Sequence, residues 1–341
     1  MKAEGGRKKD QSQGAESKDQ ALVHPSSFIP HPCIVAAAVI LRADGAFLFA
    51  RRPEGKPYAG YWEFPGGKLL PGETALDALK RELKEELDLT IDEAWPWLTR
   101  EYVYPHASVR LHFFRVFRWR GNAQGLEGQA VAWQRAGEIS IAPMLPANAP
   151  VLRALALPPV YAITSANEIG VDRYLERLKG AFEAGIKMIQ VREKEMPLAK
   201  FRDFTRRVID MASSHGAKVL LNSAHLSEAE STGAHGIHLT AKNLIQRKAR
   251  PESELCAASC HNAAELERAV ALELDFVVLG PVRATQSHQE WTPLGWLDFS
   301  RLISAYPLPV YAIGGMRRDD IERACSHGAH GVAMIRGLIQ G

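Results

Sequence analysis

Three glutamates on one expected helix are the residues of this sequence best suited to binding a metal ion. Glu82, Glu85 and Glu86 lie in a segment, residues 74–87, whose leucines recur at helical spacing. At about 100° per residue, the three carboxylates share an arc of roughly 100° beside the apolar stripe. Carboxylates this close repel one another unless cations neutralise them, and hard oxygen ligands suit Mg²⁺ or Mn²⁺. On the helix alone, a solvated acidic face is the commoner interpretation of such a pattern.

The sequence around these glutamates defines the helix that would position them. Thr74, followed three residues later by Asp77, resembles a capping box at the start of the helix. Arg81 lies one turn before Glu85 and is placed to hold its carboxylate. The leucines predict one buried stripe, made of Leu76, Leu79, Leu83 and Leu87.

The loop before the helix favours a metal site over a solvated acidic helix face. Gly67 is followed after five residues by Glu73, and after seven more by Arg81-Glu82-Leu83, one residue and Glu85-Glu86. This spacing matches the Nudix box, and the segment closely resembles the MutT-type Nudix hydrolases, which cleave nucleoside diphosphates linked to another group. One position departs from the family, because the glycine after the helix is Asp88 here. We expect Asp88 to take a left-handed backbone at some cost in stability, with metal binding retained.

The resemblance covers most of residues 31–156 and implies further site residues. Arg51 and Arg52 precede the loop as in MutT-type enzymes, where the second arginine contacts substrate phosphate or base. Glu63-Phe64-Pro65-Gly66 matches the segment whose backbone reads the base and whose glycine carbonyl ligates metal. The segment 126–129, with Trp133, resembles the one that supplies a further metal-binding or general-base glutamate, which is Glu127 here.

The substrate implied by the resemblance depends on one asparagine. Asn148, within residues 146–150, lies in a segment resembling the one that recognises 8-oxoguanine in the enzymes that sanitise the nucleotide pool. An amide suits that task because it offers both a donor and an acceptor to a base edge. A loop asparagine between prolines is also an ordinary turn residue. Taken with the other motifs, Asn148 favours 8-oxo-dGTP over other Nudix substrates.

The resemblance also implies a mechanism, in which Mg²⁺ or Mn²⁺ assists hydrolysis of a small nucleotide. The implied metal ligands are the Gly66 carbonyl, Glu82, Glu85 and Glu86. Glu127, or alternatively Glu73, would orient or deprotonate the attacking water, with Arg81 and Glu85 completing the catalytic set. The MutT-type reaction releases the nucleoside monophosphate and pyrophosphate.

The second half of the sequence follows a different pattern. Prolines crowd residues 143–159, which predicts a domain boundary there. Beyond it, short apolar runs alternate with helix-length amphipathic segments such as 173–184, 201–214 and 263–272. Eight such runs predict a (β/α)₈ barrel. They are residues 160–164, 187–192, 218–222, 236–240, 255–259, 276–282, 309–314 and 331–335. We therefore expect an α/β chain with a tail (1–30), an α/β/α Nudix sandwich (31–156) and a compact TIM barrel (157–341).

The barrel half resembles thiamine phosphate synthase and its relative, the thiazole tautomerase. The motifs that carry this resemblance include Tyr161–Thr164, Ile189–Lys194, Gly236–Leu239 and Ala312–Gly315. Each lies at the end of an expected strand, where barrel active sites are built. The residues of this half expected to bind a ligand are Gln190, Arg192, Lys194, Asn222, Ser259, His261, Thr285, Gly314 and Gly315.

Several synthase positions are altered in this half. The family's Asn-Asp-Arg run reads Asn222-Ser223-Ala224, which removes a carboxylate that would hold Mg²⁺ near pyrophosphate. Thr240-Ala241 replaces a family glutamine, and the loop 284–288 lacks the family lysine. We therefore expect a barrel that binds a phosphorylated ligand but is a poor or inactive synthase. His261 is either a proton-transfer group of the tautomerase kind or a surface histidine at a helix start.

Composition limits the remaining functions. The chain has 341 residues, 46% hydrophobic and 24% charged, with a net charge of +3, which excludes a wholly disordered or coiled-coil protein and predicts no nucleic-acid polymer as partner. No apolar run is long enough for a membrane span or a signal core, so we expect a cytoplasmic protein. Cys256, Cys260 and His261 lie close together, but ordinary buried cysteines explain them better than a metal site.

Three hypotheses result. The first is an 8-oxo-dGTP hydrolase attached to a degenerate barrel. The second is a bifunctional protein, in which the barrel is an active synthase or tautomerase and the Nudix half acts on another pyrophosphate substrate. The third makes the barrel a non-catalytic module that binds a thiamine precursor.

Overall fold

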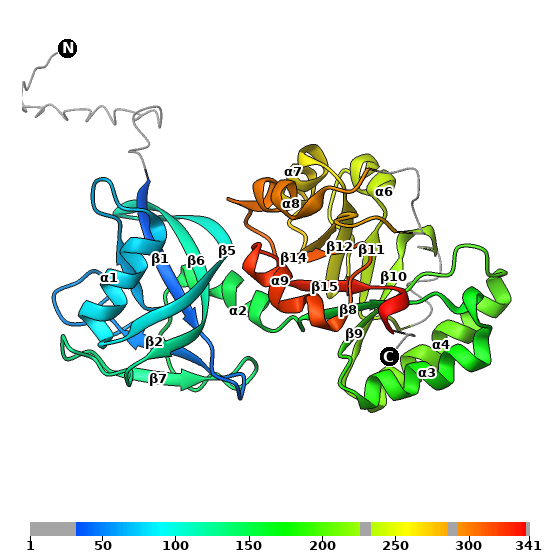
Figure 1. The fold of residues 1–341 in the computed structure, drawn as a ribbon, viewed down its shortest axis with the longest axis horizontal. Coiled ribbons are helices and arrows are strands. Elements are labelled where there is room, and N and C mark those ends of the chain that lie inside the picture. The colour runs from blue at the N-terminus through cyan, green and yellow to red at the C-terminus, as the bar shows by residue number, and fades with distance from the viewer. Residues whose placement is uncertain (1–31, 226–232, 286–291, 339–341) are drawn as a thin grey trace, which may run out of the picture.

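The computed structural model describes residues 32–225, 233–285 and 292–338. The expected tail at 1–30 and the altered loop positions 286–288 lie outside these residues. Two lobes lie side by side, an N-terminal one built on mixed sheets and a C-terminal barrel (Figure 1). No helix in the described ranges has the length and apolar character needed to cross a membrane.

The N-terminal lobe contains two sheets. Its seven strands are β1 (Cys33–Ile40), β2 (Phe47–Arg51), β3 (Trp62–Glu63), β4 (Gly66–Lys68), β5 (Thr90–Tyr104), β6 (Ala107–Arg120) and β7 (Val131–Gln134). The larger sheet has the order β4-β1-β6-β5, with β1 parallel to β6, and the smaller one has the order β3-β2-β7. Apolar runs of the sequence at residues 34–41, 47–50 and 109–119 coincide with β1, β2 and most of β6.

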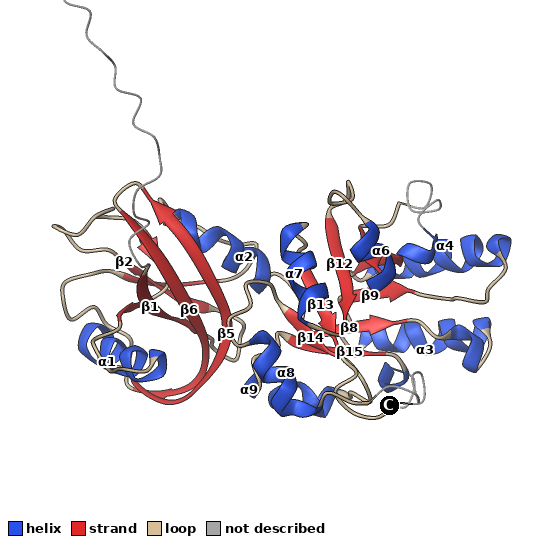
Figure 2. Cartoon of the chain, turned by 90° about the horizontal axis from the view of Figure 1, so that it is seen from above, coloured by secondary structure: helices blue, strands red, loops and turns tan. Residues whose placement is uncertain are grey.

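Alternation along β1 builds a core on each side of the larger sheet. Ala36, Ala38 and Ile40 pack with the helix α1 (Ala75–Leu87), whereas Ala37 and Val39 pack with aromatic residues of β2 and with α2 (Ala149–Leu155). Successive strand residues point to opposite faces, so a strand that is apolar throughout must be covered on both. This layering confirms the expected sandwich (Figure 2).

Helix α1 begins and ends nearly as expected. The Thr74 hydroxyl accepts a hydrogen bond from the Asp77 amide at 3.2 Å. The Asp77 carboxylate bonds back to that hydroxyl rather than to the Thr74 amide, so the cap is not a full capping box. Asp88 ends the helix with φ 55° and ψ 31°, which confirms the left-handed backbone. Leu79, Leu83 and Leu87 are fully buried, and Leu76 is partly buried at the edge of the stripe.

The C-terminal lobe is a closed barrel of eight parallel strands, as the alternation predicted. The strands are β8 (Val160–Ile163), β9 (Met188–Val191), β10 (Lys218–Asn222), β11 (Gly236–Leu239), β12 (Leu255–Cys260), β13 (Phe276–Leu279), β14 (Val310–Ala312) and β15 (Gly331–Met334). The α-helices described around it are α3 (Val171–Glu183), α4 (Leu198–Ser214), α6 (Ala241–Gln246), α7 (Ala263–Ala271), α8 (Gly295–Ile303) and α9 (Ile321–Ser326). Inside the barrel, Tyr161, Phe276 and Tyr311 pack with ring centroids 5.1–5.8 Å apart.

The two lobes are joined by α2 and by direct contacts between β5, β6 and the barrel (Figure 1). The Thr99 amide donates to the Tyr306 carbonyl at 3.1 Å. Arg115 of β6 is buried and donates to the carbonyls of Ala329 and His330. The barrel is therefore packed against the back of the sheet that carries the acidic helix.

Candidate functional site

The acidic helix packs against two consecutive glycines, Gly66 and Gly67. Any side chain at either position would clash with neighbouring atoms and force them to move. A Cβ on Gly67 would lie 2.0 Å from the Glu82 Cδ, so the carboxylate of Glu82 rests directly on this backbone. Gly66 has φ 148°, and a Cβ there would lie 2.1 Å from the Ala36 carbonyl oxygen. The double glycine therefore allows β4 to lie between β1 and the carboxylates of α1.

Arg81 binds three of the acidic side chains. Its guanidinium contacts Glu73 at 2.7 Å, Glu82 at 2.9 Å and Glu85 at 3.2 Å, and it donates to the Lys68 carbonyl at 3.0 Å. Hydrogen bonds from Arg81 and from the Leu70 amide lower the pKa of Glu73 to about 2. A carboxylate with so little affinity for a proton is a poor general base at neutral pH, so Glu73 is a residue that positions Arg81.

Glu86 has the opposite environment. Burial raises its pKa to about 7, and the negative charges of Glu82, Glu127 and Glu63 act in the same direction. The opposing influence is Lys56, whose ammonium lies 3.5 Å from Glu86 and 3.1 Å from Glu127. Several carboxylates are thus close together at a partly buried position. Their mutual repulsion and loss of hydration would be relieved by a bound cation.

This donor set fits a divalent metal ion. Within the described ranges, no three His, Cys, Asp or Glu side chains are already gathered as a metal site. The carboxylates are kept apart by two cationic side chains. Arg81 binds Glu82 and Glu85, while Lys56 binds Glu86 and Glu127. A metal ion would bind Glu82, Glu85 and Glu86, with the Gly66 carbonyl on the adjacent strand.

Lys56 is a site residue that the sequence reasoning missed. It lies in a loop rich in glycine and proline, and only its position after Arg52 could have drawn attention to it. Replacement by glutamine should strengthen Mn²⁺ binding to the nucleotide-free protein several-fold, because a competing cation is removed. If the resemblance to Nudix hydrolases holds, the same change should raise the KM for a nucleoside triphosphate, because a positive charge that would lie near its phosphates is lost. Isothermal titration with Mn²⁺ and steady-state kinetics measure the two effects, and Lys80→Gln on the exposed side of α1 is the control.

The arginines of the preceding strand bind protein groups in this structure. The Arg52 Nη1 contacts both carboxylate oxygens of Glu63, at 2.7 and 2.5 Å, and the Arg52 Nε donates to the Pro57 carbonyl. Burial raises the pKa of Glu63, and the Arg52 charge opposes this shift. Arg51 is exposed and donates to the Gly60 carbonyl at 3.1 Å. Arg52 thus fixes the loop that carries Lys56, which leaves Arg51 the more accessible of the two for a substrate.

Asn148 lies beside strand β3. It is buried, and its amide nitrogen donates to the Trp62 carbonyl at 3.1 Å. Its carbonyl oxygen and second amide hydrogen have no partner among the described residues. The Phe64 ring is in the core, 4.6 Å from Phe49, and the Pro65 carbonyl accepts from the Ala38 amide, so this segment is anchored to the sheet.

A cluster of aromatic side chains that the sequence reasoning also missed surrounds the same region. Tyr58 contacts Tyr61 and Tyr104 with ring centroids 5.2 and 5.4 Å apart, and Tyr102 lies 4.5 Å from Tyr104. Burial and the nearby Glu63 charge raise the pKa of Tyr104 to about 12. These rings are distributed over a loop and β5, so no local spacing in the sequence indicates that they meet.

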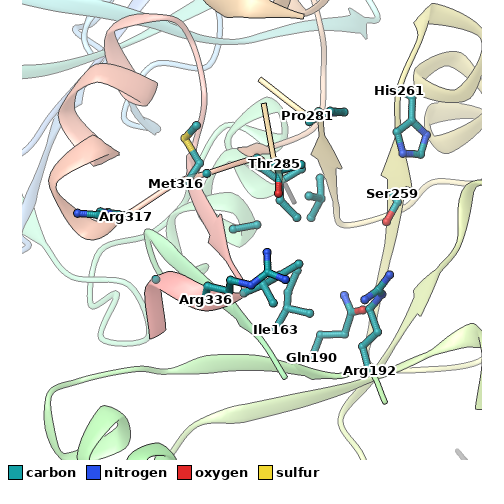
Figure 3. A pocket seen from close by; sticks show the side chains of 18 of the residues that line it. Ile163, Gln190, Arg192, Ser259, His261, Pro281, Thr285, Met316, Arg317 and Arg336 are labelled. Atoms are coloured by element: carbon teal, nitrogen blue, oxygen red, sulfur yellow. The ribbon is translucent and has the colours of Figure 1, made fainter. Parts of the chain in front are cut away.

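The barrel has a separate pocket of about 320 Å³ at the carboxyl ends of its strands. Gln190, Arg192, Ser259 and Arg336 surround it (Figure 3). The expected residues His261, Thr285, Gly314 and Gly315 also line the pocket. The described part of the barrel mouth therefore brings together most of the ligand-binding residues predicted for this half.

Two of the predicted barrel residues do not line this pocket. Lys194 lies three residues beyond the end of β9 at Val191, where strand alternation no longer applies, and its side chain is exposed. Asn222 is buried below the mouth, where its amide nitrogen donates to Gln190 at 3.0 Å. His261 both faces the pocket and begins the segment before α7, where its ring nitrogen lies 2.9 Å from the Glu265 carboxylate.

A buried chain of hydrogen bonds connects Asn222 to the pocket. Gln190 donates to the Tyr161 oxygen at 3.2 Å, which leaves the tyrosine hydrogen for the His238 Nδ1, also at 3.2 Å. Burial lowers the pKa of His238 to about 3, so the ring is neutral and carries its proton on Nε2. Nε2 lies 2.9 Å from the Ser259 oxygen and donates to it. The Ser259 hydroxyl is therefore left as a donor toward the pocket.

Comparison with known proteins assigns each half to a family. The family model described as NUDIX domain matches residues 31–155, and the one described as Thiamine monophosphate synthase matches residues 160–338. The chain is 37% identical to the CTP pyrophosphohydrolase of Escherichia coli, over 36% of this chain and 90% of that protein. It is 36% identical to the 8-oxo-dGTP diphosphatase of Haemophilus influenzae, over 36% of this chain and 89% of that protein. It is 31% identical to the thiamine-phosphate synthase of Gloeobacter violaceus, over 54% of each chain.

Proposed function

Because the chain belongs to the NUDIX family in its first half and to the thiamine monophosphate synthase family in its second, we propose that residues 31–156 form a metal-dependent hydrolase of nucleoside triphosphates and that residues 157–341 form a ligand-binding barrel. The preferred substrate of the hydrolase is 8-oxo-dGTP. The observation that carries this proposal is the partly desolvated Glu86, on which the charges of Glu82, Glu127 and Glu63 converge.

The residues around Glu86 have distinct tasks in the proposed reaction. Glu82, Glu85, Glu86 and the Gly66 carbonyl would hold Mg²⁺ or Mn²⁺, which would supply positive charge to the triphosphate. Arg81 orients Glu82 and Glu85, and Lys56 turns from the carboxylates toward the phosphates. Glu127 accepts a proton from the attacking water, because the hydrogen bonds from Arg81 make the Glu73 carboxylate too weak a base for this step. Attack at the phosphorus nearer the ribose gives the nucleoside monophosphate and pyrophosphate.

Recognition of the base rests on Asn148 and the tyrosine cluster. The free carbonyl oxygen of Asn148 suits the N7–H donor that 8-oxoguanine has and guanine lacks. Its amide orientation is fixed by the bond to the Trp62 carbonyl, so little ordering is needed on binding. The rings of Tyr58, Tyr61 and Tyr104 offer apolar faces beside it.

Replacing Asn148 by alanine should narrow the preference for 8-oxo-dGTP over dGTP by about tenfold to a hundredfold, as expected for one or two lost hydrogen bonds. Specificity constants for 8-oxo-dGTP, dGTP and CTP, measured with Mg²⁺, test this. Asn122→Ala, an exposed change in the same lobe, should keep the wild-type ratios. If the unaltered protein prefers CTP or does not distinguish dGTP from its 8-oxo form, the assignment of Asn148 fails while the hydrolase assignment stands.

For the barrel, we propose binding of a phosphorylated thiamine precursor or product with weak or absent synthase activity. Arg192, Ser259 and the backbone at Gly314-Gly315 supply donors to a phosphate at the mouth. Ser223 stands where the synthases carry a metal-binding carboxylate, and its hydroxyl oxygen accepts from the Thr240 amide and the Asn243 side chain. An active synthase remains the alternative.

Ser259→Ala should weaken thiamine phosphate binding to the full chain by about tenfold, since one oriented hydroxyl donor is lost. Titration calorimetry measures this, and Ser304→Ala, an exposed change at the C-terminal cap of α8, is the matched control. Thiamine phosphate formation by the full chain should stay at background. Turnover at a rate typical of enzymes would replace the binding assignment with the active-synthase alternative.

A further inference from the structure

A second cavity, of about 1220 Å³, lies where the two lobes meet. It is bounded by Arg100 of β5, Arg153 of α2 and residues at or just before the starts of barrel strands, such as Lys187, Lys218 and Pro309. These are the amino ends of the strands, so the cavity lies at the opposite end of the barrel from the pocket of Figure 3. It is also separate from the acidic helix, since none of its lining residues belongs to α1 or β4.

The lining of this cavity carries an excess of positive charge. Five arginine or lysine side chains line it, against three carboxylates. Two of the cations are neutralised locally, because Lys218 pairs with Glu254 and Arg250 lies 2.6 Å from Asp275. Arg100 and Arg153 have no carboxylate within ion-pair distance among the described residues.

One of the two unpaired arginines is fixed across the junction, and the other is carried by the connecting helix. The Arg100 guanidinium donates to the Pro307 carbonyl of the barrel at 3.0 Å, which fixes it across the junction. Arg153 is carried by α2, the helix that connects the lobes. Partial burial and the charge of Arg153 both lower the pKa of Arg100, which shows that the two charges oppose one another. An anion between them would remove this repulsion.

We propose that the junction cavity is a binding site for a diphosphate-bearing anion, with Arg100 and Arg153 as its principal ligands. Guanidinium groups present planar pairs of donors that match phosphate oxygens. Prolines and leucines of the linker and barrel, including Leu157 and Pro158, form apolar walls beside the arginines. The site exists only because the two lobes are joined, and it is independent of the reaction proposed for either lobe.

The test is calorimetric titration of the full chain with inorganic pyrophosphate and, separately, with ADP, both in EDTA. Without metal, the carboxylates of the acidic helix repel diphosphates, so binding there is suppressed. Arg192→Gln removes the contribution of the barrel mouth. In that background, Arg100→Gln and Arg153→Gln should each weaken diphosphate binding at least tenfold. Pyrophosphate binding alone identifies a free diphosphate as the ligand, and tighter ADP binding identifies an organic one.

Folding controls accompany these variants. Arg206→Gln, an exposed change on α4, should bind both probes as the unaltered protein does. Without ligand, Arg153→Gln should unfold at the same or a slightly higher temperature, because a repulsive charge is removed. The proposal is overturned if Arg100→Gln and Arg153→Gln bind pyrophosphate and ADP with unchanged affinity and stoichiometry, or if neither probe binds in the Arg192→Gln background. Either result would leave the hydrolase assignment untouched.

Discussion

Glu86→Gln is expected to lower kcat for 8-oxo-dGTP hydrolysis by on the order of a hundredfold or more, with folding intact. The amide keeps the size of the side chain but removes the charge on which the site is built. Loss of one carboxylate weakens binding of a divalent ion. The negative charge of the triphosphate is then no longer neutralised by that ion. Pyrophosphate release in the presence of Mg²⁺ or Mn²⁺ measures the effect. Glu138→Gln, an exposed change in the same lobe, is the control for handling and fold.

The same substitution should stabilise the metal-free protein at pH 8. Burial raises the pKa of Glu86 to about 7, above its ordinary value of 4.5. Between these two values the folded protein binds more protons than the unfolded chain, so stability falls as pH rises through this window. At pH 8 the ionised Glu86 is a cost that glutamine does not have. A rise in melting temperature of a few degrees in EDTA, absent at pH 4, is therefore expected together with the loss of activity.

Turnover and melting temperature of Glu86→Gln together distinguish a metal-binding role of α1 from a solvated acidic face. If α1 were only a solvated acidic face, Glu86→Gln would change neither turnover nor the pH dependence of stability. A fall in activity with a fall in melting temperature would show a damaged fold rather than a lost ligand. Normal hydrolysis by the variant would remove Glu86 from the site altogether.

The sequence predicted the features that depend on neighbours along the chain. The leucine stripe of α1, the left-handed Asp88 and the order of strands in the barrel follow from local periodicity and turn chemistry, and the structure confirms them. Lys194, which was expected to bind a ligand, does not line the barrel pocket, because β9 ends at Val191 and strand alternation does not extend to it.

Contacts between distant segments were beyond the reach of sequence patterns. Lys56 meets Glu86 and Glu127, which lie 30 and 71 residues further along the chain. Nothing in the loop marks it as a cation of the site. Arg115 is a similar case, since an arginine within an alternating strand is ordinarily a solvent-facing residue. Only the docking of the barrel onto β6 shows that this side chain is buried.

Arg115 is accordingly the residue whose loss should most weaken the connection between the lobes. Its guanidinium donates to the Ala329 and His330 carbonyls and lies 5.2 Å from the Trp97 ring centroid. Burial, with Arg115 acting in the same direction, lowers the pKa of His330 to about 3, so the histidine stays neutral beside the arginine. Arg115→Met keeps much of the packing volume but leaves two buried carbonyls without these donors. We expect it to lower the free energy of unfolding by about 2–4 kcal/mol.

Arg118, on the same strand, provides the comparison. Its side chain is 69% exposed and lies 3.6 Å from Glu322 of the barrel at the rim of the contact. Screened by water, this pair should contribute less than about 1 kcal/mol, so Arg118→Met should unfold almost as the unaltered chain does. Denaturant unfolding followed by tryptophan fluorescence compares the two. A single transition that splits into two for Arg115→Met would show that the buried guanidinium makes the lobes unfold together. Equal unfolding of both variants would mean that the buried Arg115 guanidinium does not couple the unfolding of the two lobes.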